Sequence, residues 1–231
     1  VFALVAIPVF KKAPDGARRI LRFATVFSNS AYMAIPLIQA LIDAQKNGII
    51  KSGEISLVIS SNPNAYALKR AENSNIPTFV ADKKALGSQE AFEAAIEKEL
   101  AAHKIDLIVL AGFMSILSES FTSCYPKRIL NVHPSLIPSF CGEGFYGLRV
   151  HEAALAYGVK VSGATVHFVN EIPDGGKIIM QKAVEVREGD TPEVLQKRIM
   201  EEAEWKILPE AVKLFCDDKI TVENGKTIIS K

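Results

Sequence analysis

The chain has 231 residues, 48% hydrophobic and 23% charged, which is enough apolar material for one substantial core and one main domain. Its 27 lysines and arginines balance its 26 aspartates and glutamates, which argues against the strongly basic face of nucleic-acid-binding proteins and favours small-molecule substrates. Cys124, Cys141 and Cys216 are widely spaced and lack the pairing of a zinc site, so we expect no metal, no catalytic thiol and a reduced, cytoplasmic compartment.

Short β-branched runs alternate with helical stretches through the first part of the chain. The runs cover residues 55–61, 78–81, 107–113 and 129–135. Before the third run, Phe92, Ala95, Ile96 and Leu100 repeat at helical spacing. This order predicts a parallel sheet with covering helices. Because 107–113 is apolar without alternation, we expect a central strand whose carboxyl end binds ligand.

The second part of the chain predicts an antiparallel hairpin followed by a long helix. Residues 162–171 and 177–186 alternate around an Ile-Pro-Asp-Gly-Gly turn, and the helix begins near Pro192 and is interrupted near Pro209. Asn224 and Gly225 predict a short terminal hairpin. The predicted class is α/β, with an open, mostly parallel, twisted sheet, helices on both faces and a Rossmann-like topology. The predicted domains are an atypical segment 1–37, a catalytic domain 38–215 and a hairpin tail 216–231.

Two polar side chains lie two residues apart at the end of one predicted strand. Asn131 and His133 therefore project from the same strand face. An amide donor and an imidazole suit acyl transfer, because both can stabilise negative charge on a carbonyl oxygen. Two alternatives remain open here: His133 can be a structural histidine, and Asp174 can be an ordinary turn residue. His167 is expected to be packed, within reach of Asp174 across the hairpin turn.

The stretches NVHPSLIPSF and SGATVHFVNEIPDGGKIIMQKAVEV resemble the glycinamide ribonucleotide formyltransferase family, from about residue 41 to residue 215. The resemblance implies formyl transfer from 10-formyltetrahydrofolate to an amine in purine biosynthesis, without a metal. It also implies that Asn131, His133 and Asp174 form the catalytic group and that the Asp174 carboxylate keeps the imidazole protonated.

The same resemblance implies the ligand-binding residues. The folate site would be formed by Met114, Ser115, Ile116, Leu117, Gln89 and Asn131. Where the family often has arginine this chain has Ser115, and Gln89 also stands where some relatives have arginine; a solvated helix start is the alternative for Gln89. Glu204 matches a glutamate that holds the amine substrate, with an exposed helix charge as the alternative.

The first forty residues lack the glycine-rich loop that would hold a substrate phosphate at a helix start. Residues 22–37 instead resemble a segment of auxin-efflux-type carriers, and residues 20–42 are about long enough to cross a bilayer. We expect instead a strand over 21–28, a helix starting at Pro36, and a substitute phosphate loop made of Ser28, Asn29 and Ser30. Without glycines that loop should bind phosphate weakly.

Other functions stay open at this point. Methionyl-tRNA formyltransferase and formyltetrahydrofolate hydrolase share the chemistry, although each normally carries a further domain. A folate-binding or membrane-associated protein with impaired catalysis is the third alternative. The expected partners are small molecules rather than nucleic acid, membrane association is not favoured, and no oligomeric state is predicted.

Overall fold

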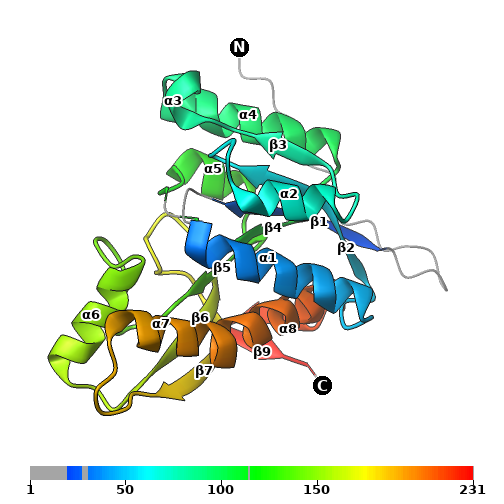
Figure 1. Ribbon diagram of the computed structural model, residues 1–231. Helices are drawn as coiled ribbons and strands as arrows, with labels where there is room; N and C mark the ends of the chain where they lie inside the picture. The colour runs from blue at the N-terminus through cyan, green and yellow to red at the C-terminus, as the bar shows by residue number, and fades with distance from the viewer. Residues whose placement is uncertain (1–19, 28–30, 114, 231) are drawn as a thin grey trace.

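The computed structural model describes residues 20–27, 31–113 and 115–230. A seven-stranded sheet runs through the molecule (Figure 1), with five parallel strands, a sixth that runs in the opposite direction and a seventh that pairs antiparallel with the sixth. In sheet order the strands are β3 (Thr78–Val80), β2 (Gly53–Ser60), β1 (Leu21–Phe27), β4 (Leu107–Leu110), β5 (Ile129–His133), β6 (Val161–Phe168) and β7 (Ile178–Glu185). The predicted fold class is confirmed, and the run 107–113 supplies the middle strand.

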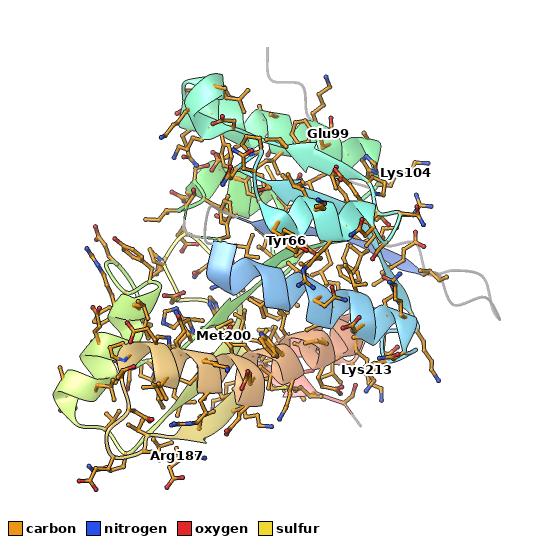
Figure 2. The ribbon with its side chains drawn as sticks, in the orientation of Figure 1. Tyr66, Glu99, Lys104, Arg187, Met200 and Lys213 are labelled. Atoms are coloured by element: carbon orange, nitrogen blue, oxygen red, sulfur yellow. The ribbon has the colours of Figure 1, made fainter. Side chains whose placement is uncertain are left out.

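Helices cover both faces of this sheet. The side chains of β4 are buried on both sides, because Leu107 and Val109 pack into one core cluster and Ile108 and Leu110 into the other. The first cluster includes residues of α1 (Ala31–Lys46), α2 (Tyr66–Glu72), α7 (Pro192–Ile199) and α8 (Trp205–Cys216). The second includes residues of α4 (Gln89–Ala102), which follows α3 (Lys83–Leu86), and of α5 (Glu119–Cys124). Met200 is buried in the interior, whereas exposed Lys104 and Arg187 lie at the periphery (Figure 2).

The N-terminal part of the described chain belongs to the centre of the sheet. β1 pairs with β2 on one side and β4 on the other, as expected for a first strand. Helix α1 begins at Ala31, so the prediction that Pro36 starts it is wrong: Pro36 lies in the second turn. The predicted boundary at residue 37 falls inside this helix. Ser28, Asn29 and Ser30 lie outside the described residues. None of the helices in the described part of the chain is long and apolar enough to cross a membrane.

The C-terminal helix is interrupted one turn earlier than predicted. Met200–Glu204 form a π-helical turn between α7 and α8, and Pro209 lies inside α8. A proline ring clashes with the carbonyl four residues before it, here that of Trp205, which directly follows the π-helical turn. β8 (Ile220–Glu223) and β9 (Lys226–Ile229) form the predicted terminal hairpin.

The loop after β5 is clamped by the neighbouring strand. Thr165 of β6 lies opposite His133 and is fully buried. Its hydroxyl donates to the carbonyl of Ser135 at 2.7 Å and accepts from the Ile137 amide at 3.1 Å and from Gln181 Nε2 at 2.9 Å. One donor and two acceptor positions are the full capacity of a hydroxyl. This residue therefore fixes the chain that leaves His133.

We predict that Thr165→Val destabilises the protein by about 2 kcal/mol, because valine keeps the shape but leaves the partly buried Ile137 amide and the buried Ser135 carbonyl unpaired. Thr221→Val on exposed β8 is the matched control, with an expected change within about 0.5 kcal/mol. Urea unfolding monitored by circular dichroism gives both values. Equal losses in the two variants would contradict the clamp.

Candidate active site

A cavity of about 460 Å³ lies beyond the carboxyl ends of β4 and β5, where the sequence predicts a ligand site. The connection from β6 to β7 closes one side of it, and the loop after β5 closes another. The predicted site residues that line it are Asn131, His133, Asp174, Glu204, Ser115, Ile116 and Leu117. Side chains separated by up to ninety residues of sequence therefore meet in one space.

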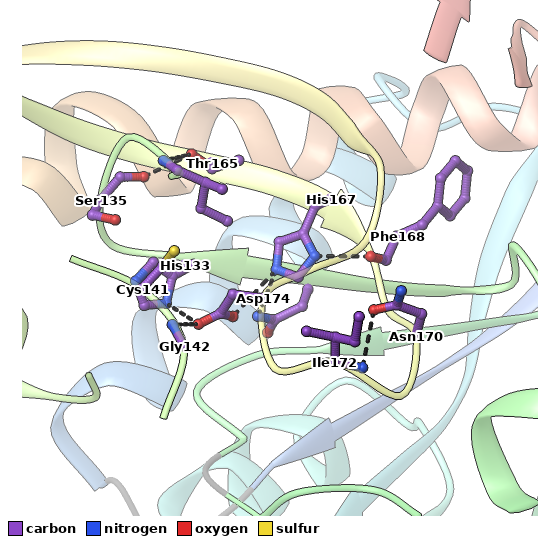
Figure 3. A network of polar contacts seen from close by, with 12 residues as sticks. His133, Ser135, Cys141, Gly142, Thr165, His167, Phe168, Asn170, Ile172 and Asp174 are labelled. Atoms are coloured by element: carbon purple, nitrogen blue, oxygen red, sulfur yellow. Dashed lines mark hydrogen bonds and ion pairs between the residues drawn. The ribbon is translucent and has the colours of Figure 1, made fainter. Parts of the chain in front are cut away.

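The Asp174 carboxylate lies between two buried imidazoles (Figure 3). Its Oδ2 is 3.4 Å from His133 Nδ1 and its Oδ1 is 3.5 Å from His167 Nε2. The Gly142 amide also donates to Oδ2 at 2.9 Å. The side chains of His133 and His167 are only 6% and 2% exposed, so water screens these contacts little.

A tight backbone turn carries Asp174 back over β5. Asp174 has a φ of 55°, in the left-handed region that aspartate tolerates better than most residues. Two residues later, a Cβ on Gly176 would lie 1.6 Å from the Phe168 carbonyl oxygen. Only glycine permits that approach. The second glycine of the predicted Ile-Pro-Asp-Gly-Gly turn is therefore required at this position.

Hydrogen bonds to carbonyl groups settle one proton on each imidazole. His133 Nε2 is 2.9 Å from the Phe140 carbonyl and His167 Nδ1 is 2.8 Å from the Phe168 carbonyl. A carbonyl only accepts, so both nitrogens donate. The other nitrogen of each ring, His133 Nδ1 and His167 Nε2, faces Asp174. Each ring can therefore take a second proton only on the side of the carboxylate.

Burial is the largest influence on His133 and lowers its pKa. The Asp174 charge and the Phe140 carbonyl raise the pKa, the charge of His167 lowers it, and the result lies below the ordinary value of 6.5. Asp174 thus favours the imidazolium, in the direction that the sequence predicts, but burial outweighs it in the free protein. Burial also raises the pKa of Asp174, but His167, His133 and the Gly142 amide outweigh it, so the carboxyl is ionised at neutral pH.

His167 belongs to the site more closely than the sequence indicated. It is opposite Asn131 in the β5–β6 pairing, and its Nε2 lies 3.2 Å from Asn131 Nδ2 as well as near Asp174. The sequence placed it as a packed residue within reach of Asp174, and both descriptions hold. The sequence signal for this is its position two residues after Thr165, because residues two apart on a strand lie on the same face.

The predicted folate loop contacts the start of α4. Met114 lies outside the described residues, and Ser115, Ile116 and Leu117 line the cavity. Gln89 does not line it, but its Nε2 donates to the Ile116 carbonyl at 3.1 Å. Gln89 is thus the first residue of a helix, as the alternative expected, yet it is partly buried and bonded to the loop.

Glu204 lies in the π-helical turn and is 3% exposed, so the alternative of an exposed helix charge is wrong. Burial raises its pKa to about 8, and no described residue pairs with it. The Glu204 carboxyl lines the cavity. With this pKa it is neutral at pH 7. Within the described residues, no cluster of histidine, cysteine, aspartate and glutamate side chains is arranged to hold a metal ion.

Residues 22–212 match the protein family described as formyl transferase. The chain is 43% identical over 190 residues to the trifunctional purine biosynthetic protein adenosine-3 of Gallus gallus, covering 82% of this chain and 18% of that protein. It is 38% identical over 188 residues to phosphoribosylglycinamide formyltransferase of Escherichia coli, covering 81% and 85%. The solved structure of glycinamide ribonucleotide transformylase 1 from Symbiobacterium toebii matches with a TM-score of 0.83 and 39% identity, covering 92% of this chain and 95% of that one.

These matches extend the earlier resemblance toward the N-terminus. The family match begins at residue 22 rather than near residue 41, so the likeness of 22–37 to auxin-efflux-type carriers is not supported. The chain spans less than a fifth of the trifunctional relative and most of the length of the bacterial ones.

The raised pKa of Glu204 makes the free energy of unfolding depend on pH, and a Glu204 variant can measure this contribution. The folded carboxyl keeps its proton up to about pH 8, whereas the unfolded one loses it near 4.5. Between these values unfolding releases a proton, so this group lowers stability by about 1.4 kcal/mol per pH unit as pH rises. We predict that Glu204→Gln removes this slope in urea unfolding from pH 5 to 8.

The control is Glu201→Gln, which changes an exposed glutamate of the same turn and should leave the slope of the wild type. Identical slopes in wild type and Glu204→Gln would show that Glu204 is already ionised at pH 7.

Proposed function

We propose that this chain, which belongs to the formyl transferase family, transfers a formyl group from 10-formyltetrahydrofolate to the amine of glycinamide ribonucleotide in purine biosynthesis. The supporting observation is the convergence of Asn131, His133 and Asp174 on the cavity that the predicted folate loop also lines. We place the reaction in the cytoplasm, which suits the three free cysteines.

The proposed reaction begins with attack of the amine nitrogen on the formyl carbon. The new C–N bond moves an electron pair onto the formyl oxygen, where the Asn131 amide and, once it has taken up a proton, His133 would stabilise the charge. The growing negative charge adds to that of Asp174 and raises the pKa of His133, so the ring can take the proton that the amine releases. Collapse of the intermediate breaks the bond to N10 of the folate, and N10 receives that proton.

Glu204 is proposed to hold the amine before attack. Glycinamide ribonucleotide carries an amino group that is protonated near neutral pH. Pairing with this cation would stabilise the Glu204 carboxylate and release its proton to water. The carboxylate could then accept a proton from the ammonium, which leaves the free amine that the reaction needs. Burial makes such an exchange feasible because it brings the two pKa values together.

The phosphate of the ribonucleotide is proposed to bind at Ser28, Asn29 and Ser30, which connect β1 to the first turn of α1. A helix start offers free amides and a favourable dipole. The absence of glycine there favours weaker phosphate binding than in a glycine-rich loop. Folate binding does not depend on this segment in the proposal.

Purified protein mixed with 10-formyltetrahydrofolate and glycinamide ribonucleotide should release tetrahydrofolate. We predict that Asn131→Ala and His133→Ala each lower turnover about a hundredfold or more with folding kept, because each removes stabilisation of the oxyanion. Absorbance of the folate gives the rate, and circular dichroism checks the fold.

The same assay separates the alternatives. Tetrahydrofolate release that needs no amine would identify a hydrolase, and release only with methionyl-tRNA would identify the tRNA enzyme. Folate binding without release would leave a binding protein. Near-normal turnover of either alanine variant would remove that residue from the mechanism.

A further inference from the structure

The charge of the cavity does not match that of the proposed cosubstrate. The ionisable lining residues of the described chain include Glu143, Glu171, Asp174 and Glu204, and neither lysine nor arginine is among the described lining residues. A reduced folate joins an uncharged ring system to a glutamate tail with carboxylates. Glu204 is neutral and adds no charge, but the carboxylates of Glu143, Glu171 and Asp174 repel such a tail, so we expect a cation near the lining to favour its binding.

Lys83 is linked to the cavity lining through two intermediate residues, Gln89 and Phe92. Its Nζ contacts Gln89 Oε1, and Gln89 donates to the carbonyl of Ile116, which lines the cavity. The ammonium also lies 6.0 Å from the centre of the Phe92 ring, which stacks on Phe113 at 6.5 Å. Phe113 lines the cavity as well. Two separate contacts, to Gln89 and Phe92, therefore hold this cation one residue away from the lining residues Ile116 and Phe113.

Both N–H donors of the Gln89 amide are used in this arrangement. Its Nε2 donates to Glu93 Oε1 at 2.5 Å and to the Ile116 carbonyl, and its Oε1 accepts from Lys83. Glu93 is buried and also accepts from the amide and the hydroxyl of Ser118, at 2.7 and 2.5 Å. Carboxylates and carbonyls only accept, so they fix the orientation of the amide. Gln89 thus has no N–H donor left for a ligand. The Lys83 ammonium has three N–H donors, and one of them is bonded to Gln89.

We propose that Lys83 binds the carboxylates of the glutamate tail of the folate, and that Gln89 acts as a positioning residue that holds Lys83 beside Ile116. This inference rests on the proposed function, because it takes a folate as the ligand. It gives Gln89 a task other than the folate contact predicted from the sequence.

The test is the dissociation constant of tetrahydrofolate carrying one or three glutamates, measured by calorimetry on wild type, Lys83→Met and Lys84→Met. Lys84 is exposed, neighbours Lys83 in α3 and loses the same charge. An exposed ion pair predicts about three- to fivefold weaker binding of the monoglutamate by Lys83→Met, and a larger loss for the triglutamate. Lys84→Met should stay within about 1.5-fold of wild type.

Salt gives a second measurement. At 0.5 M sodium chloride the difference between wild type and Lys83→Met should largely disappear, because screening weakens an exposed ion pair. Equal weakening by both lysine variants, or none by either, would overturn the assignment. Binding is measured without formyl transfer, so a wild type that binds folate but transfers no formyl group would contradict the proposed function and leave this inference testable.

Discussion

One carboxylate between two buried imidazoles is the interaction on which the candidate site depends. Asp174 faces His133 and His167 at 3.4 and 3.5 Å, and both rings are already committed by their other nitrogens to carbonyl groups. Burial lowers the pKa of His133, and the anion works against that effect. The ring is thereby neutral in the free protein and able to gain a proton when negative charge develops beside it.

The sheet topology explains how these groups meet. The parallel strands β4 and β5 direct their carboxyl ends to one edge, which is where α/β folds bind ligands. The antiparallel strand β6 then places His167 opposite Asn131 and Thr165 opposite His133. The connection to β7 turns back across this edge at Asp174, and Gly176 permits its close approach to the Phe168 carbonyl. The strands and the turn at Asp174 therefore bring the reacting groups together, and Phe140 and Gly142 of the loop after β5 hold His133 and Asp174 in place.

Local patterns predicted the elements and most of the site. The apolar run 107–113 indicated a central strand, and the two-residue spacing of Asn131 and His133 indicated a shared face; both follow from strand periodicity. The protonation of His133 and the burial of Glu204 could not be predicted this way, because they depend on the packing of distant elements. The local sequence also did not predict that α1 starts before Pro36 or that a π-helical turn precedes Pro209.

The pairing of Asp174 with His133 is tested most directly by nuclear magnetic resonance titration of the His133 ring in wild type and in Asp174→Asn. The account predicts a wild-type pKa below 6.5, and a value lower by about one unit or more in the variant, because burial remains while the anion that favours the imidazolium is lost. Circular dichroism of both proteins should confirm the same fold. A His133 pKa that is unchanged or higher in Asp174→Asn would contradict the central claim.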